Sequence, residues 1–380
     1  MAMSASTGPS AVAPQASKIE RKLLNFFPVP KYLEMPTVGL RVSEHAVRFI
    51  ELVRTRHGLR VGRYAERPVK SEKVNPQDVQ HNEELKSILR SIKKEFDLSF
   101  ITATLPEEKS YLFKTEIPVV DESEIASSVE FLIEENVPIS LPEAVFDYEI
   151  IQSGNAHPEH IDVSVTVVPL QIVNNYTELF QSVGLTPLSF SLESKAIARG
   201  VVREGDTNSY MIVNISTSKT SISIVDSGVV QFSSNVNFGG EAFSSAIKKH
   251  YYVDGPGAHA IKVEKGFKQG SETMELLGVL MNTISVLKDE ISRLLVYWES
   301  FKNKSAEPTK KISGIILCGR DAGIIGLDEY LALSLKMKVE RANVWVNAFS
   351  LDDYIPSIEA NMSLSFAAPI GLALDKLHYA

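Results

Sequence analysis

The chain has 380 residues, of which 44% are hydrophobic and 23% are charged, and its formal net charge at pH 7 is −8. This composition excludes a wholly disordered chain, and the acidic balance argues against a general nucleic-acid-binding protein. The single cysteine, Cys318, excludes an internal disulfide and favours a reducing compartment, and no apolar run approaches the roughly 18 residues of a membrane span. At about 100–200 residues per domain, the length predicts two compact lobes.

Residues 1–34 are expected to form a tail followed by a short arm. Residues 1–17 are small and polar and lack the apolar core of a signal peptide, which indicates a disordered tail. Apolar side chains then recur at helical spacing (Ile19, Leu23, Phe26 and Phe27). Such an arm could lie against a membrane or a neighbouring protein, but docking on its own domain is the favoured interpretation.

The stretch from Lys18 to Lys70 is basic, with 12 Lys and Arg residues against 5 Asp and Glu residues. It could form a patch for anionic lipid or for an acidic partner protein. Because these charges are spread through strand-like sequence and not gathered in a short run, a solvated surface is the favoured interpretation.

Alternating apolar residues predict a three-stranded antiparallel meander in residues 35–74. Its strands are Val38–Val42, Val47–Leu52 and Leu59–Tyr64. This meander is expected to open the first lobe.

Residues 75–190 mix helical and alternating patterns and are predicted to hold an inserted α+β subdomain and the return to the first lobe. The insertion itself is expected over residues 75–170. The predicted elements are a helix over Leu85–Phe96, strands at Phe100–Thr104 and Tyr111–Lys114, a helix from Asp121, strands at Val145–Gln152 and His160–Val168, and a helix over Ile172–Val183.

The second half repeats the opening pattern. Residues 191–240 are predicted to hold an interlobe helix and a second meander, residues 241–311 a helical subdomain, and residues 312–380 the end of the second lobe with a closing helix. The meander strands are Tyr210–Ile215, Thr220–Val225 and Val229–Val236, the last two joined by a hairpin turn at Asp226-Ser227-Gly228. Further predicted elements are a strand at Ile312–Leu317, helices over Leu327–Leu335 and Phe366–Leu374, and a strand near Val339. This internal duplication is the strongest indication of the fold.

Four turns at strand ends could bind phosphate, because a tight turn or a helix N-terminus aims backbone N–H groups at one point. They are Ser43–Ala46, Asn214–Thr220, the glycine pair Gly239-Gly240 before a helix, and Leu317–Gly323. Each turn alone is also common without a ligand, and in the first one Glu44 would repel phosphate. Their order in a duplicated architecture makes the set more specific than its members.

These motifs resemble those of the actin-like ATPase superfamily, a duplicated ribonuclease H-like α/β fold with two lobes. Within it, the chain from about Met35 onward is similar to the PilM family of type IV pilus assembly proteins, which are related to the division protein FtsA. The matching segments are Gly39–Arg48 (first phosphate motif), Pro138–Tyr148 (inserted subdomain, of the SHS2 type), Leu192–Arg199 (interlobe helix), Val213–Thr220 with Gly239-Gly240 (second phosphate motif), Ile315–Ala322 (adenosine motif) and Ala367–Leu374 (closing helix).

The resemblance implies ATP with Mg²⁺ as the ligand of the cleft. The residues that match nucleotide-contacting positions are Ser43, Arg48, Asn214, Ser216, Thr217, Thr220, Gly239, Gly240, Lys262, Gly319 and Arg320. No catalytic residue and no metal ligand is assigned, because Arg41 and Asn214 stand where the family usually has acidic residues. We therefore expect a degenerate cleft that binds ATP weakly or not at all and does not hydrolyse it.

The function implied by the resemblance is that of a cytoplasmic scaffold for type IV pilus assembly. Its partner would be the cytoplasmic N-terminal peptide of a PilN-like inner-membrane protein, held near the inserted subdomain, together with other pilus assembly proteins. That partner would recruit the chain to the inner face of the cytoplasmic membrane, with membrane contact only indirect or weak. The alternatives are an active Mg-ATP-binding ATPase and an FtsA-like division protein; a sugar kinase is disfavoured.

Overall fold

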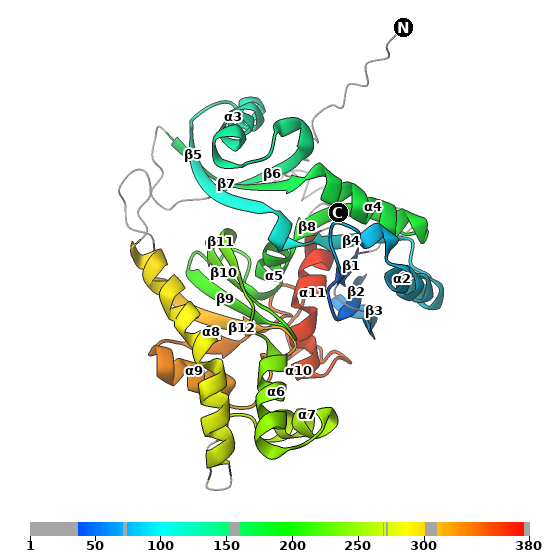
Figure 1. Cartoon of the computed structure of the whole chain (residues 1–380). Coiled ribbons are helices and arrows are strands. Elements are labelled where there is room, and N and C mark those ends of the chain that lie inside the picture. Colours follow the sequence, from blue (N-terminus) through cyan, green and yellow to red (C-terminus); the bar gives the residue numbers. More distant parts are fainter. Residues whose placement is uncertain are drawn as a thin grey trace.

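The computed structural model describes residues 37–70, 74–151, 160–268, 270, 273–300 and 310–375. Two lobes lie side by side, and a smaller subdomain lies above them in Figure 1. The tail and arm expected in residues 1–34 lie outside the described residues. In the described part of the chain, no helix combines the length and the apolar character needed to cross a bilayer.

The first-lobe sheet runs in the order β3-β2-β1-β4-β8. Its strands are β1 (Thr37–Val42), β2 (Ala46–Thr55), β3 (Gly58–Pro68), β4 (Phe100–Leu105) and β8 (Thr186–Leu192). The first three pair antiparallel, whereas β4 and β8 extend the sheet in parallel with β1. The predicted opening meander is confirmed, and it continues into a parallel half.

The expected start of the insertion at residue 75 is wrong, because α2 (Glu83–Phe96) and β4 belong to the first lobe. The Asn82 side chain accepts a hydrogen bond from Leu85 N (3.0 Å) and caps α2. The buried stripe of α2 packs into the same core as β1 and β4, together with helix α4 (Leu170–Ser182). An alternating pattern predicts a strand but does not tell which sheet that strand joins.

The inserted subdomain consists of β5 (Tyr111–Pro118), α3 (Glu122–Asn136), β6 (Ala144–Ile150) and β7 (His160–Pro169). Its sheet has the order β5-β7-β6 with antiparallel pairing. One face of α3 covers this sheet with Ile125, Val129 and Ile133, which are buried in a separate small core. A single turn, η2 (Glu107–Lys109), connects β4 of the first lobe to β5.

The second-lobe sheet has the order β11-β10-β9-β12-β13. As in the first lobe, the first two pairs in this order are antiparallel and the last two are parallel. Its strands are β9 (Ser209–Ile215), β10 (Thr220–Asp226), β11 (Val229–Val236), β12 (Ile312–Cys318) and β13 (Val339–Arg341). The helices are α6 (Gly240–Tyr251), α7 (Gly255–Glu264), α8 (Met274–Ser300) and α9 (Leu327–Leu335). The predicted duplication is therefore confirmed strand by strand.

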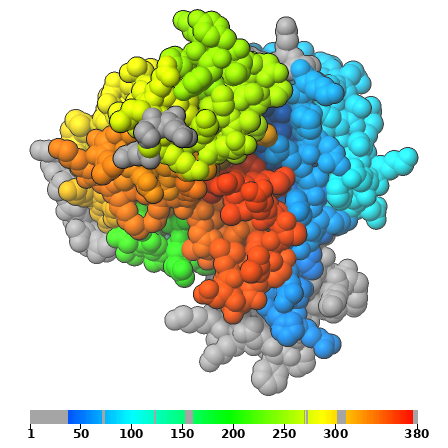
Figure 2. Space-filling model, turned by 90° about the horizontal axis from the view of Figure 1, so that it is seen from below, coloured from blue at the N-terminus to red at the C-terminus, as the bar shows by residue number. Residues whose placement is uncertain are grey.

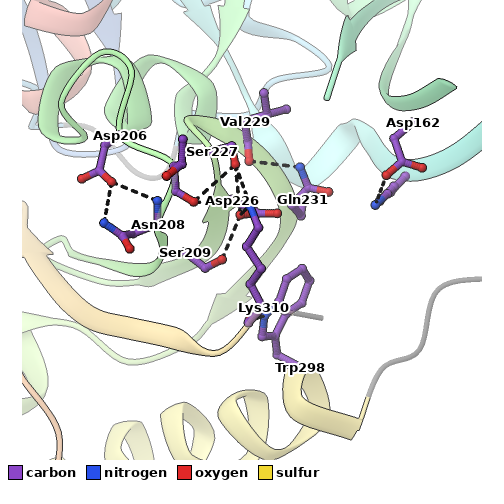
Figure 3. Close-up of polar contacts among 12 residues, drawn as sticks. Asp162, Asp206, Asn208, Ser209, Asp226, Ser227, Val229, Gln231, Trp298 and Lys310 are labelled. Atoms are coloured by element: carbon purple, nitrogen blue, oxygen red, sulfur yellow. Dashed lines mark hydrogen bonds and ion pairs between the residues drawn. The ribbon is translucent and has the colours of Figure 1, made fainter. Parts of the chain in front are cut away.

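The predicted turn between β10 and β11 is a two-residue hairpin, in which Ser227 and Gly228 both have positive φ (51° and 81°). Lys310 anchors this turn, since its Nζ donates to Ser227 Oγ (2.9 Å) and to Asp226 Oδ1 (3.1 Å). The carbonyl of Lys310 accepts from Trp298 Nε1 (3.0 Å), as Figure 3 shows. The end of α8 and the start of β12 are thereby attached to one corner of the sheet.

Two helices cross between the lobes: α5 (Glu193–Val201) and α11 (Ala367–Asp375), which follows α10 (Ala360–Ser363). Their backbones come so close that a Cβ on Gly371 would lie 1.7 Å from Ala196 O, and one on Gly200 would lie 2.7 Å from Ala367 O. The closing helix of small residues is thus confirmed as a close-packing element. Seen from below, the chain leading into α11 (red) lies between the first-lobe strands (blue) and second-lobe elements (orange) in Figure 2.

Candidate functional site

A cleft opens where the tips of the two sheets face each other. It is lined by the β1–β2 loop, the turn η2, the start of α5, the β9–β10 loop and the segment after β12. Its free volume is about 130 Å³, below the roughly 300–1,000 Å³ of typical small-molecule pockets. Several of the side chains that line it are charged, and the pairs that they form determine what the cleft can bind.

The structure brings most of the sequence-predicted site residues together in this cleft. The residues that line it are Ser43, Arg48, Asn214, Ser216, Thr217, Gly319 and Arg320. The residues that do not line it are Thr220, Gly239, Gly240 and Lys262. The two halves of the chain therefore contribute to one site, as expected from the duplication.

The glycine pair does not leave the N-terminus of α6 open for a ligand. Gly240 N donates to Ser216 O (2.9 Å) and Glu241 N donates to Thr217 O (2.8 Å). A Cβ on Gly239 would lie 2.5 Å from Thr217 O, so this glycine allows the β9–β10 loop to approach the helix. Thr220 also turns inward, where its Oγ1 donates to Phe238 O (2.7 Å). The sequence identified the right loop and helix, but they bind each other.

Lys262 lies below the cleft in a buried ion pair. Its Nζ is 2.6 Å from Asp321 Oδ1 and also donates to Gly240 O (3.3 Å). Both side chains are over nine-tenths buried, so the pair must compensate the cost of removing two charges from water. Lys262 is therefore committed to an intramolecular partner, and Asp321 is a residue that the sequence analysis missed.

Arg41 and Asn214, the two departures from acidic positions, meet at a single carboxylate. Arg41 Nη2 lies 2.8 Å from Glu193 Oε1, and Asn214 Nδ2 donates to the same oxygen at 2.8 Å. Glu193 is the first residue of the interlobe helix α5. Glu193 thus binds one residue from each sheet. The only sequence signal for this role is its position at the start of the interlobe helix.

Arg48 and Arg320 share a second carboxylate, Glu66 on β3. Arg48 Nε is 2.7 Å from Glu66 Oε2, and Arg320 Nη1 is 2.7 Å from Glu66 Oε1. Partial burial disfavours the ionised form of Glu66, but the two guanidinium groups outweigh it and lower its pKa below the ordinary value. Both arginines predicted to contact a nucleotide are thus paired within the protein.

Lys219 meets two further carboxylates. Its Nζ lies 2.7 Å from Glu44 Oε1 and 2.5 Å from Glu108 Oε1, and the neighbouring Ser218 Oγ donates to Glu44 Oε2 (2.8 Å). Burial opposes ionisation of Glu44, yet the hydrogen bonds from Lys219 and Ser218 lower its pKa. Burial also disfavours the charged Lys219, but its bonds to Glu108 and Glu44 raise its pKa. Glu44 and Lys219 are consequently both charged at neutral pH.

Glu107 differs from the other carboxyl groups of the cleft because burial raises its pKa. Its Oε2 accepts a hydrogen bond from Ser194 N (3.0 Å), the second residue of α5. The cleft therefore contains one carboxyl group whose pKa is raised, Glu107, near Glu44, whose pKa is lowered.

As they are arranged, the charged residues of the cleft are paired with one another. Among the described residues, no cluster of three or more His, Cys, Asp or Glu side chains could hold a metal ion. Arg or Lys side chains engage four carboxylates of the site, Glu44, Glu66, Glu108 and Glu193, and the first N–H groups of α6 are already satisfied. Phosphate groups would have to displace several of these ion pairs to enter.

Comparison with known proteins relates this architecture to type IV pilus assembly proteins. A family model described as type IV pilus assembly protein PilM matches residues 39–377. A solved PilM–PilN type IV pilus biogenesis complex contains a chain with 18% identity and a TM-score of 0.68, covering 89% of this chain and 97% of that one.

More distant solved structures share the fold. The ethanolamine utilization protein EutJ from Carboxydothermus hydrogenoformans has 15% identity and a TM-score of 0.51, with 91% of each chain covered. MreB 5 of Spiroplasma citri bound to AMPPNP has 12% identity and a TM-score of 0.51, covering 90% of this chain and 96% of that one. The expected two-lobed actin-like α/β fold is thereby confirmed.

Proposed function

Because the chain belongs to the family of the type IV pilus assembly protein PilM, we propose that it is a cytoplasmic scaffold of pilus assembly that binds the N-terminal peptide of a PilN-like inner-membrane protein. The observation that carries this proposal is the match of the family model over residues 39–377, which include both lobes and the inserted subdomain. Supporting it, the fold extends over 97% of the similar chain in a PilM–PilN complex.

The place for such a peptide is a cavity next to the inserted subdomain, which we call the subdomain cavity. It has a volume of about 240 Å³ and lies between β6, α5 and the β10–β11 turn, lined among others by Glu149, Lys195, Arg199, Val229 and Val230. The ammonium group of Lys195 lies 3.5 Å from Glu149 Oε2 and 3.7 Å from Asp147 Oδ2. This size and mixture of apolar and charged walls suit side chains of a short segment, not a folded domain.

The experiment is a titration of the purified protein with the fluorescently labelled N-terminal peptide of a PilN-like protein from the same organism. Val229→Trp should fill the subdomain cavity and weaken binding at least about tenfold, a loss of roughly 1.4 kcal/mol. Val286→Trp, on the exposed face of α8, is the matched control and should bind like the wild type. Equal binding by both variants would place the peptide elsewhere, and no binding by the wild type would refute the proposal.

Such a partner would recruit the chain to the inner face of the cytoplasmic membrane. Recruitment then depends on the partner and not on the basic stretch of Lys18–Lys70. Flotation with anionic vesicles should recover the protein only when the PilN-like segment is anchored in them. Flotation on bare anionic vesicles would instead assign membrane binding to this chain itself.

We also propose that the cleft neither binds Mg-ATP with useful affinity nor hydrolyses it. The support comes from the residues themselves, since Arg41 cannot ligate a metal ion and Asn214 is a neutral, weaker ligand. Calorimetric titration with Mg-ATP and with Mg-ADP should give no saturable heat. A Mg²⁺-dependent hydrolysis that Asn214→Ala abolishes would overturn this part of the proposal.

A further inference from the structure

Among the residues that the structure describes, ion pairs cross the cleft from one lobe to the other at two places. On the first-lobe side, the acceptors are Glu44 after β1, Glu66 on β3 and Glu108 in η2; on the second-lobe side, the donors are Lys219 after β9 and Arg320 after β12. The distances from nitrogen to oxygen are 2.5 to 2.7 Å. Each donor therefore makes direct contact with the opposite lobe.

Lys219 makes the more constrained of these contacts. It binds two carboxylates that arise from different segments, the β1–β2 loop and the turn η2, and η2 leads directly into β5 of the inserted subdomain. One ammonium group thus connects the second lobe both to the first lobe and to the base of the insertion. Opening the cleft would break both bonds and the Ser218–Glu44 hydrogen bond.

Partial burial distinguishes the Lys219–Glu44 pair from ordinary surface ion pairs, which contribute little to stability, whereas Glu108 and Arg320 are 40% and 50% exposed. The side chains of Lys219 and Glu44 are only 28% and 21% exposed. The surface pair of Lys338 and Glu340, by comparison, is 68% and 47% exposed and joins residues of one lobe. A network of partly buried charges is screened less by solvent than an isolated exposed pair.

We propose that Lys219 and Arg320 form an ionic latch that holds the two lobes closed without a nucleotide. The latch occupies the place between the sheet tips where the resemblance to actin-like ATPases leads one to expect phosphate groups. This inference rests on the proposal that the cleft does not take Mg-ATP. Closure is then an intrinsic property of the chain and responds to ionic strength, and a nucleotide does not control it.

The test measures the distance between the lobes in the full chain. Ser87 on α2 and Ser245 on α6 are exposed, and both are changed to cysteine to carry spin labels; the native Cys318 is fully buried and does not compete for the label. Pulsed electron resonance compares this double-labelled protein with the same protein carrying Lys219→Met. The matched control is Lys338→Met, which removes an ion pair within the second lobe.

Lys219→Met is expected to shift the distance distribution to longer values and to broaden it, whereas Lys338→Met leaves it unchanged. Raising the salt concentration to about 1 M reduces the screening length to about 3 Å. It should therefore also shift the distance distribution of the labelled protein without Lys219→Met to longer values. An unchanged distribution in Lys219→Met, with salt also without effect, would overturn the latch.

Two further measurements keep the outcomes separate. If Lys219→Met does not fold, Glu44→Gln combined with Glu108→Gln removes the acceptor charges with nearly the same shape and should lengthen the distance likewise. Mg-ATP is added to the labelled wild type, and a shift of its distances would refute both the latch and the proposed empty cleft. No shift with Mg-ATP and no shift in the variants would refute the latch alone.

Discussion

The two lobes share one strand order, but the tips that they turn toward each other carry opposite charges. The loop after β1 presents Glu44, and the corresponding loop after β9 presents Lys219. Alternating apolar residues build each sheet and leave the turn residues free to differ. Two sheets with the same strand order can therefore carry turns that are complementary to each other.

The lobes also differ below their tips, where the second lobe has the buried pair of Lys262 and Asp321. Asp321→Ala would leave a buried ammonium group with only Gly240 O at 3.3 Å as a partner. We expect a loss of about 3–5 kcal/mol in the free energy of unfolding. Urea denaturation measures the total, and hydrogen exchange should locate the loss in the second lobe.

The control for this variant is Asp328→Ala, which breaks a pair with the partly exposed Arg341 in the same lobe. It should cost no more than about 1 kcal/mol. Equal losses of unfolding free energy in both variants would show that burial does not increase the contribution of the Lys262–Asp321 pair to stability.

The second prediction concerns the crossing that both lobes share. Gly371→Ala places a methyl group 1.7 Å from Ala196 O, which only a shift of α5 or α11 can relieve. We expect a loss of about 3 kcal/mol, at the upper end of the usual cost of overpacking. Gly278→Ala on α8, where a methyl group meets nothing within 4 Å, should instead stabilise the protein by up to about 1 kcal/mol.

The third prediction isolates the contact between the tips. A double-mutant cycle of Glu44→Ala and Lys219→Ala, followed by urea denaturation, should give a coupling free energy of about 1 kcal/mol. The same cycle on Glu340 and Lys338 should give a value near zero. Similar couplings for the two cycles would mean that the tips contribute no more than an exposed surface pair.

The smallest expected effect comes from Glu107. Because its pKa is raised on folding, the unfolded chain ionises first, and stability is lost as pH rises above the ordinary pKa of Glu near 4.3. Glu107→Gln should therefore stabilise the protein at pH 7, by up to about 1 kcal/mol, and should make no difference well below pH 4. Thermal melting across this pH range measures the difference.

Glu44 and Glu66 have the opposite sign and provide the internal check. Their pKa values are lowered on folding, so their contribution is present above the ordinary pKa and is lost as pH falls through the folded value. Replacing either residue by glutamine should thus lower the free energy of unfolding at pH 7. Stabilisation at neutral pH by Glu44→Gln would contradict the geometry of the cleft.

The sequence predicts most of the fold because periodicity reflects burial. Both meanders, the hairpin at Ser227-Gly228 and the small-residue helix around Gly371 follow from local patterns. The sheet that β4 joins does not follow from its local pattern, because alternating residues would fit the inserted sheet or the first-lobe sheet equally well. Parallel pairing with β1 is a long-range property that no local pattern contains.

For the site, the sequence predicts location better than partners. Arg48, Asn214 and Arg320 are placed in the cleft by motif and order, and the structure brings them together. Their carboxylate partners Glu66 and Glu193 come from a strand and a helix start whose patterns are ordinary. Which acid faces which base depends on how the two sheets are oriented, and this orientation follows from packing between the lobes.

The crossing of α5 and α11 limits how the lobes can move. Backbone touches backbone at Gly371 and Gly200, so neither helix has a side chain there that could change rotamer to let the other slide past. A one-residue translation would push the side chain of a neighbouring residue into a carbonyl group. The crossing therefore acts as a fulcrum, and any relative motion of the halves must be a rotation about it.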